Sequence, residues 1–283
     1  MTKHCSNLGI IIGLIFSIAC ANAENITVKG SDTLVILAQK WAEVYMSKHP
    51  ETKIQVTGGG SGIGFAALQN NTTDIADASR PIKAAEKAAC IKAFGKAPKE
   101  YKVALDGLSV YVHSDNPINE LSIEQLGKIF TGKVKNWKEI GGSDSPITVY
   151  SRENSSGTYE FFKEHVLKGQ DFVSSAQTMP GTAALLQNVS RDKNGIGYGG
   201  AAYGHGAKAL KIKETADSAA IEPSDENVIS GKYPIWRYLY NYLSPEKDKG
   251  EIAAYLAWIR SSEGQKIVKD VGYYPLPEHA GEK

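Results

Sequence analysis

The chain of 283 residues carries 32 lysines and arginines against 31 aspartates and glutamates, a formal net charge of +1. This balance argues against a nucleic-acid-binding protein, because such domains usually carry a clear basic excess. Hydrophobic residues make up 42% of the chain and charged residues 22%, a composition that excludes a disordered chain. The length is sufficient for one large hydrophobic core or two smaller ones.

The first 23 residues have the pattern of a secretory signal peptide. Lys3 provides a short charged start, residues 8–19 are apolar, and Ala21-Asn22-Ala23 is a small-x-small cleavage site. The apolar stretch is shorter than the roughly 20 residues that a bilayer-spanning helix needs. We therefore expect export to the periplasm and removal of residues 1–23. That removal deletes Lys3 and no acidic residue, so the mature chain has 31 residues of each sign.

The cysteines leave one alternative open and exclude a disulfide framework. Ser17-Ile18-Ala19-Cys20 loosely resembles a lipoprotein processing site, with lipid anchoring at Cys20. Because Ser17 stands where such sites have a larger aliphatic residue, soluble export is favoured. Of the three cysteines only Cys90 remains after residue 23, so the mature fold has no internal disulfide. We expect Cys90 to be a small, buried helix residue rather than a nucleophile.

The segment after the signal peptide alternates short strands with helices. Ile26 and Val28 predict a strand that ends at Gly30, and residues 34–45 place apolar side chains at helical spacing. A strand at residues 54–56, a helix beginning near Phe65 and a short strand around Ile75 follow. This order predicts an α/β fold with parallel sheets, in which ligands bind beyond the carboxyl ends of the strands.

Two longer strand-like passages divide the chain into two predicted lobes. Residues 103–113 form a crossing into the second lobe, and residues 232–243, rich in tyrosine, form the return. We expect lobe I to contain residues 24–104 and 232–283, and lobe II to contain residues 105–231. The two crossings would act as a hinge.

Several elements are predicted within the second lobe and at the chain end. Ser122–Gln125 is a capping box that opens a helix toward Phe130. A strand at residues 147–150 precedes a helix at residues 159–167. Residues 194–200 are glycine-dense and predict a turn that leads into a short strand. A final helix contains residues 252–259.

Three loops share one pattern, in which a strand end is followed by Gly, Ser or Thr residues and then by a helix start. They are Gly30-Ser31-Asp32-Thr33, residues 58–64 around Ser61, and residues 151–158 with Ser155, Ser156 and Thr158. Helix N-termini present unsatisfied N–H groups and the positive end of the helix dipole, which suit an anion. One such loop is ordinary helix capping, but three from both predicted lobes favour a shared oxyanion site.

Two arginines follow predicted strands beside these loops. Arg152 comes directly after the strand at residues 147–150, and Arg80 ends the sequence Ala78-Ser79-Arg80 after the strand at Ile75. A guanidinium offers paired donors that match phosphate or carboxylate oxygens. Both arginines are therefore candidate anion ligands, although a single arginine is more often a surface residue.

With these motifs the sequence resembles the periplasmic phosphate-binding proteins of the phosphate ABC transporter, the PstS-like type II periplasmic-binding proteins. The resemblance runs from about Ile26 through most of the chain. Its most telling stretch is Arg152-Glu153-Asn154-Ser155-Ser156-Gly157-Thr158, supported by Gly30–Thr33, Gly58–Gly62, Ala78–Arg80, and Ile129–Gly132 with Asn136-Trp137.

The resemblance implies a two-lobed fold, each lobe a mainly parallel sheet flanked by helices, that closes on one phosphate by hinge motion. It implies a monomeric, non-catalytic protein without metal or cofactor, and a membrane permease as partner. Together with the loop pattern, it gives these candidate phosphate-binding residues: Ser31, Asp32, Thr33, Ser61, Ser79, Arg80, Arg152, Ser155, Ser156, Gly157 and Thr158.

The sequence departs from a well-known branch of this family at one position. That branch has an aspartate where this chain has Arg80, and the aspartate is thought to accept the proton that phosphate carries and sulfate lacks. This chain has an aspartate at Asp32 instead. Our hypothesis is that Asp32 accepts the phosphate proton while Arg80 compensates its charge. The simpler interpretation is that Asp32 caps its helix.

Alternatives to phosphate capture remain. The same fold could bind another tetrahedral oxyanion, such as sulfate, molybdate or tungstate, or serve as a surface adhesion or sensory protein. Enzyme motifs are absent from the sequence: Ile63 replaces the last glycine of a G-x-S-x-G elbow, and no Walker A loop is present. Gly195–Gly200 fits G-x-G-x-x-G but follows no clear strand, and the histidines lack metal-site spacing.

Overall fold

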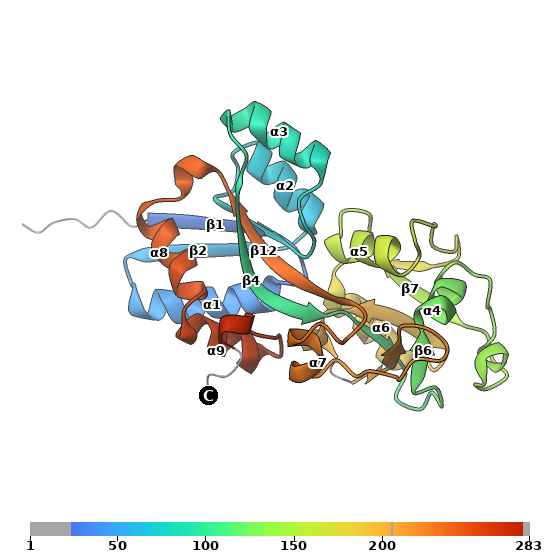
Figure 1. Cartoon of the computed structure of the whole chain (residues 1–283). Coiled ribbons are helices and arrows are strands. Elements are labelled where there is room, and N and C mark those ends of the chain that lie inside the picture. Colours follow the sequence, from blue (N-terminus) through green and yellow to red (C-terminus); the bar gives the residue numbers. More distant parts are fainter. Residues whose placement is uncertain (1–23, 205, 280–283) are drawn as a thin grey trace, which may run out of the picture.

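The computed structural model describes residues 24–204 and 206–279, so the predicted signal peptide and Cys20 lie outside the described residues. Two five-stranded sheets lie side by side, each flanked by helices (Figure 1). The first sheet has the order β2 (Thr52–Thr57), β1 (Glu24–Gly30), β3 (Ile75–Ala78), β12 (Trp236–Leu243) and β4 (Lys99–Gly107). The second has the order β10 (Lys208–Ala209), β5 (Ser109–Val112), β9 (Gly195–Gly199), β7 (Thr148–Arg152) and β8 (Gln177–Met179). A third pairing joins β11 (Lys211–Lys213) to β6 (Glu120–Ser122).

The helices connect these strands and cover the sheets. On the first sheet they are α1 (Val35–Lys48), α2 (Ser61–Gln69), α3 (Ala84–Phe94), α8 (Gly250–Ile259) and α9 (Ser262–Val271). The chain between β4 and β12 contributes α4 (Ile123–Phe130), α5 (Gly157–His165), α6 (Thr182–Arg191) and α7 (Asp225–Ile229). Short 3-10 helices occur at Trp137–Ile140, Ala201–Tyr203, Pro245–Lys247 and Pro277–His279. Within residues 24–204 and 206–279, the helices fall short of the length and hydropathy needed to cross a membrane.

The α/β class is confirmed, and both sheets are mixed. β1 pairs in parallel with β2 and β3, as the βαβα order predicts. β12 is antiparallel to both β3 and β4. In the second sheet, β7 is parallel to β8 and β9, while β5 is antiparallel to β9 and β10. The parallel pairings place successive strand ends at one edge of each sheet, which is where the three predicted loops begin.

β4 and β12, called the crossing strands below, run side by side from the first sheet toward the second (Figure 1). The predicted crossing at residues 103–113 is interrupted at Leu108, where β4 ends and β5 begins. The Leu108 N–H donates to the Ile235 carbonyl at 3.0 Å. The two crossings therefore stay hydrogen-bonded to each other where the chain changes sheets.

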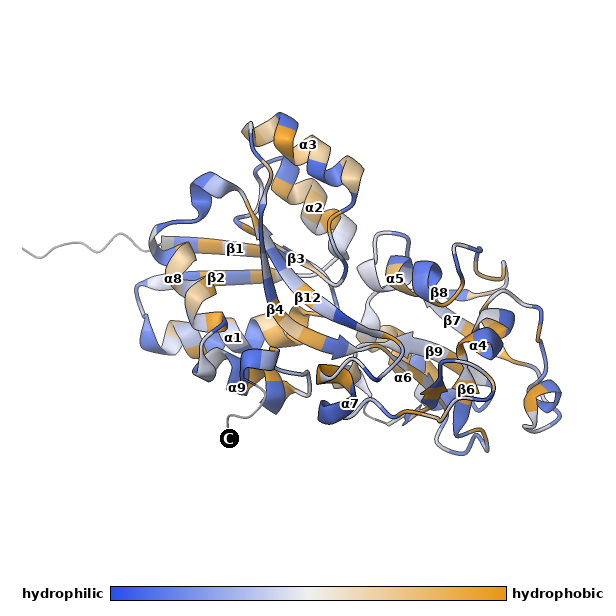
Figure 2. Cartoon of the chain, viewed as in Figure 1, coloured by the Kyte–Doolittle hydropathy of each residue, from blue (hydrophilic) through white to orange (hydrophobic). Residues whose placement is uncertain are grey.

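Each sheet builds its own hydrophobic core, as α1 illustrates. Leu37, Ala38, Trp41 and Tyr45 are buried along one helix face, the spacing expected of an amphipathic helix. The Trp41 indole donates to the Gly264 carbonyl at 2.8 Å, which fixes α9 against α1. Figure 2 shows hydrophobic and hydrophilic residues alternating along β1 and β2, hydrophobic residues in the second part of β4, and hydrophilic residues on α9. Cys90 is buried on α3, as expected, and burial raises the pKa of its thiol.

The turn predicted for residues 194–200 is wrong, because Gly195–Gly199 is the central strand of the second sheet. A Cβ on Gly197 would lie 2.6 Å from Leu185 and 2.8 Å from Val189 of α6. The glycines therefore allow a helix to pack directly on the strand. Glycine density signalled close packing here, not a change of chain direction.

A buried acid lies at the centre of the first sheet. Asp77 on β3 accepts a hydrogen bond from the Asn241 amide on β12, and both side chains are buried. Burial raises the pKa of Asp77 from 3.8 to about 7, although the Asn241 hydrogen bond lowers it in part. The Asn241 Oδ1 is buried and has no partner among the described residues. This pair leaves one acceptor unsatisfied and one carboxyl that is more easily protonated than usual.

We expect Asp77→Asn to stabilise the fold at pH 8 by about 1–3 kcal/mol. The introduced amide can accept from Asn241 Nδ2 and donate to Asn241 Oδ1. Because the folded-state pKa of Asp77 is raised, its contribution to stability falls as the pH rises from about 4 to about 7. The variant should lose that part of the pH dependence in urea unfolding, whereas the exposed control Asp217→Asn should keep it. An unchanged pH dependence in Asp77→Asn would refute this assignment.

Candidate functional site

Four hydroxyl side chains converge where the two sheets meet. Thr33 follows β1, Ser61 begins α2, Ser79 follows β3 and Thr158 lies in the first turn of α5. The oxygens of Thr33 and Thr158 are 2.7 Å apart, and Ser79 Oγ lies 3.4 Å from both Ser61 Oγ and Thr158 Oγ1. All four residues are buried. The structure therefore brings the three predicted loops to one point, called the hydroxyl cluster below.

Backbone as well as side chains meet at this cluster. A Cβ on Gly157 would lie 2.3 Å from Ser61 Oγ and 2.8 Å from Ser79 Oγ. The Gly62 N–H donates to the Ser155 carbonyl at 2.9 Å, which joins α2 to the loop before α5. Gly157 is thus required for close approach: it lets the N-terminus of α5 touch the end of the first sheet.

The helix starts supply hydrogen-bond donors to the cluster. Ser61, Gly157 and Thr158 stand in the first turns of α2 and α5, and their N–H groups have no acceptor among the described residues. Unsatisfied donors backed by a helix dipole favour a bound anion. The N–H groups can only donate, and each of the buried hydroxyls can donate as well.

Three other predicted residues shape the loops around the cluster. Ser156 caps α5, with its hydroxyl accepting from the Tyr159 N–H at 3.3 Å. Ser31 is buried and its N–H donates to the Asp77 carbonyl at 3.0 Å. Ser155 contacts α2 through its carbonyl. These three residues fix the loop geometry at the edge of the cluster.

Arg152 and Asp32 form an ion pair that joins the two sheets. The Arg152 Nη2 donates to Asp32 Oδ2 at 2.6 Å and to Glu153 Oε1 at 2.7 Å, and Nη1 donates to Thr182 Oγ1 at 2.8 Å. The Arg152 side chain is 1% exposed. Burial alone would lower the pKa of Arg152, but Glu153 and Asp32 raise it. The guanidinium therefore stays charged and is surrounded by two carboxylates.

The expectation that Arg80 compensates Asp32 is wrong. The Arg80 Nη1 and Nη2 donate to the Glu86 carboxylate at 2.7 Å each, and the guanidinium lies over the Phe65 ring. Asp32 is instead neutralised by Arg152, and its other oxygen accepts from the Gly59 N–H at 2.8 Å. The position of Arg80 directly after Ser79 suggested a ligand role. In the structure both of its terminal nitrogens pair with the carboxylate of Glu86 on α3.

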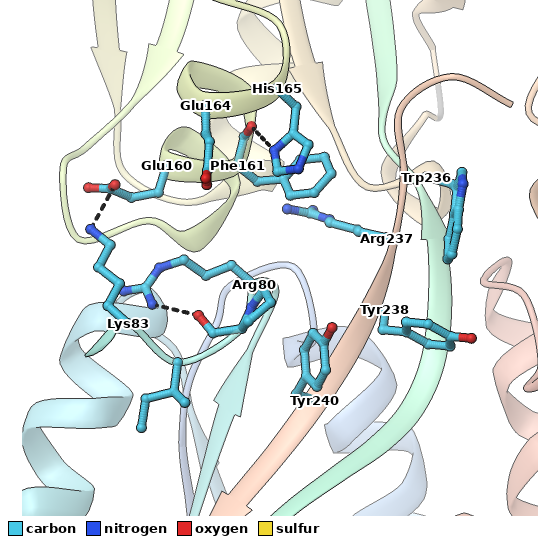
Figure 3. A pocket seen from close by; sticks show the side chains of 12 residues that line it. Arg80, Lys83, Glu160, Phe161, Glu164, His165, Trp236, Arg237, Tyr238 and Tyr240 are labelled. Atoms are coloured by element: carbon cyan, nitrogen blue, oxygen red, sulfur yellow. Dashed lines mark hydrogen bonds and ion pairs between the residues drawn. The ribbon is translucent and has the colours of Figure 1, made fainter. Parts of the chain in front are cut away.

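Arg80 lines a cavity of about 460 Å³ next to the hydroxyl cluster. Figure 3 shows Glu160, Glu164 and His165 descending from α5 on one side, Arg80 and Lys83 opposite them, and aromatic side chains of β12 beyond. Lys83 pairs with Glu160 at 2.7 Å across this opening. The cavity therefore lies between the two predicted lobes.

Arg237 and Asp106 were missed by the sequence analysis. They face each other on the crossing strands, with Arg237 Nη2 donating to Asp106 Oδ2 at 2.7 Å and to Thr158 Oγ1 at 3.0 Å. The tyrosine-rich sequence around Arg237 carries no loop or cap motif, so no local signal marks it. Two tyrosines were also missed: Tyr203 and Tyr273 donate to the carbonyls of Asp32 and Thr33 at 2.6 and 2.5 Å.

No residue of the cluster has the ligand chemistry of a typical transition-metal site. Within the described ranges, the group of three side chains that could hold a metal is His49, Glu51 and Glu251, at the end of α1 and the start of α8. Those residues are not part of the hydroxyl cluster. What the cluster can do chemically is donate hydrogen bonds to an oxyanion.

Comparison with known proteins agrees with this geometry. A model of the PBP superfamily domain matches residues 19–263. The phosphate-binding protein PstS of Pseudomonas aeruginosa is 34% identical over 275 residues, covering 92% of this chain and 85% of the relative. PstS of Bacillus subtilis is 33% identical over 256 residues, covering 90% and 81%.

The chain belongs to the PstS family of the PBP superfamily.

A solved PstS-like structure shows the same fold. It is a putative phosphate ABC transporter substrate-binding protein from Clostridium perfringens with bound phosphate, matched with a TM-score of 0.82 and 30% identity over 89% of this chain and all of that one. The PstS membership confirms the two-sheet α/β fold inferred from the sequence.

We expect Gly157→Ala to weaken anion binding by this PstS protein at least tenfold. The added methyl group would overlap Ser61 Oγ and Ser79 Oγ, so α5 would have to move away from the first sheet. Titration calorimetry with inorganic phosphate would measure the loss. Gly127→Ala is a matched control, because a Cβ on this α4 residue would meet only the Val166 carbonyl, at 3.5 Å. Equal affinities for Gly157→Ala and Gly127→Ala would contradict the close approach.

Proposed function

We propose that this protein captures inorganic phosphate outside the cytoplasm and delivers it to the membrane permease of an ABC importer. The observation that carries the proposal is the buried hydroxyl cluster, surrounded by free N–H groups at helix starts. Membership of the PstS family and the phosphate-bound relative support the choice of phosphate. In this function the protein is a binding protein and not an enzyme.

Phosphate would be held mainly by neutral donors. The hydroxyls of Thr33, Ser61, Ser79 and Thr158 and the N–H of Gly157 can each donate to a tetrahedral anion bound against the cluster. Ser31, Ser155 and Ser156 support the loops. The Arg152 guanidinium already has three side-chain partners. It would therefore act on phosphate through its positive charge, next to Asp32, and not through a pair of free N–H groups.

The lobe boundaries remain part of this proposal. Residues 24–104 with 232–283 would form lobe I, and residues 105–231 would form lobe II, with the crossing strands as hinge. Two interactions between the predicted lobes support closure: Arg152 with Asp32, and Lys83 with Glu160. We further propose a periplasmic monomer whose residues 1–23 act as a signal peptide, with lipid anchoring at Cys20 as the less favoured alternative.

Phosphate should bind the purified protein with micromolar or tighter affinity, and Asp32 should set the preference for phosphate over sulfate. Sulfate brings no proton to the Asp32 carboxylate, so we expect Asp32→Asn to reduce that preference tenfold or more. Calorimetric titration with phosphate and with sulfate gives the ratio of the two affinities. If Asp32→Asn acted only by removing the ion pair with Arg152, it would weaken the binding of phosphate and of sulfate equally. The control is Asp217→Asn.

The outcomes of that titration separate the candidate functions. An unchanged phosphate-to-sulfate ratio in Asp32→Asn would remove the proton-acceptor role. Preference for sulfate, molybdate or tungstate in the unmodified protein would favour the other oxyanions. No binding of any oxyanion would favour an adhesion or sensory role for the fold.

Small-angle scattering should show a more compact protein with phosphate than without it, because two lobes joined by two strands can close on a shared ligand. Glu160→Gln, which weakens a pair across the opening, should leave the phosphate-bound radius of gyration unchanged but favour the open form without ligand. Identical scattering curves with and without saturating phosphate would count against hinge closure and the proposed lobes.

A further inference from the structure

Among the arginines of the described chain, Arg237 is the one that hydrogen-bonds both the neighbouring crossing strand and the hydroxyl cluster. It lies on β12 and is 3% exposed. Its Nη1 donates to the Ser79 carbonyl at 2.9 Å, at the end of β3, and its Nη2 donates to Thr158 Oγ1 at 3.0 Å, at the start of α5. A single guanidinium from a crossing strand therefore touches the edges of the cluster on both sides.

The charge of Arg237 is neutralised locally. Both Nε and Nη2 donate to Asp106 Oδ2, at 3.0 and 2.7 Å, and Asp106 is completely buried on the neighbouring crossing strand. Asp106 Oδ1 accepts from the Ala201 N–H at 3.0 Å. Since the Arg237–Asp106 pair is neutral as a whole, Arg237 contributes directed hydrogen bonds to the site more than net charge.

Arg237 has one N–H group left for a ligand. A guanidinium has five N–H groups. Asp106 takes two, Thr158 takes one and the Ser79 carbonyl takes one. The fifth, on Nη1, has no acceptor among the described residues. It belongs to the same nitrogen that holds Ser79, so it lies at the edge of the hydroxyl cluster.

Arg237 also affects the direction of the hydroxyl protons in the cluster. A hydroxyl that accepts from a fixed N–H must direct its own proton elsewhere. Thr158 accepts from Arg237, and Ser61 accepts from the Ser79 N–H at 3.1 Å. Their protons are thereby directed to the remaining neighbours, which for Thr158 are Thr33 Oγ1 and Ser79 Oγ. Two N–H groups thus orient the cluster as a set of donors, the polarity that an anion requires.

We propose that Arg237 is a positioning residue of the anion site, which orients the Thr158 hydroxyl as a donor and ties the crossing strands to the closed cluster. This inference rests on the proposed phosphate-binding function. It distinguishes Arg237 from Arg152, whose guanidinium contacts Asp32 and Glu153 rather than the hydroxyls.

The decisive experiment is a double-mutant cycle read by calorimetric titration with inorganic phosphate. Arg237→Lys keeps a positive charge for Asp106 but cannot reach Asp106, the Ser79 carbonyl and Thr158 together. Thr158→Val removes the hydroxyl at constant volume. We expect each variant to bind phosphate ten- to a hundredfold more weakly. The double variant should bind within threefold of the weaker single variant, because both changes remove the same interaction.

Two controls separate this role from a general loss of stability. Unfolding in urea without phosphate shows whether each variant is folded at the temperature of titration. Thr73→Val removes another buried hydroxyl, which donates to the carbonyls of Thr27 and Ile75 away from the cluster. It should lower stability without changing phosphate affinity more than threefold. If Arg237→Lys does not fold, Thr158→Ser and Thr158→Val test the same contact: serine should keep the affinity and valine should lose it.

The outcomes are distinct. Wild-type affinity in Arg237→Lys, or losses in the double variant equal to the product of the single losses, overturns the positioning role while phosphate binding stands. Wild-type affinity in Thr158→Val does the same. Failure of the unmodified protein to bind phosphate overturns the proposed function and this inference with it.

Discussion

The structure depends on buried hydrogen-bond donors that converge at the place where the two sheets meet. Hydroxyls of Thr33, Ser61, Ser79 and Thr158 crowd together with N–H groups at the starts of α2 and α5. Buried donors without acceptors cost free energy, so an anion that supplies negative oxygens stabilises this arrangement. A small tetrahedral anion is the simplest partner that satisfies donors from all sides.

The positive charges of the buried arginines are neutralised by carboxylates, separately from the groups that would bind the anion. Arg152, Arg80 and Arg237 each pair with a carboxylate: Asp32 and Glu153 for the first, Glu86 for the second and Asp106 for the third. A buried cation without such a partner would be strongly unfavourable in the empty protein. Neutralised arginines allow the site to exist without ligand and leave recognition to directed hydrogen bonds.

The crossing strands explain how residues from distant parts of the sequence share one site. β4 and β12 are hydrogen-bonded neighbours, and their facing residues Asp106 and Arg237 reach the Ala201 N–H and Thr158. A change in the angle between these strands would therefore shift Arg237 relative to Thr158 at the start of α5. The same connection would make closure of the sheets and occupation of the site parts of one equilibrium.

The sequence by itself determined the α/β class, most strands and helices, and the three loops, because apolar periodicity, glycines and caps act locally. The loops that follow β1, β2 and β7 were predicted from that pattern. Tertiary structure alone decided the partners of the charged groups and the role of glycine-rich β9. Arg80 and Arg152 have similar local settings, yet Glu86 lies beside one and Asp32 beside the other. Arg237 has no local motif, since its contacts arise only when β12 pairs with β4 and the first turn of α5 lies beside its guanidinium.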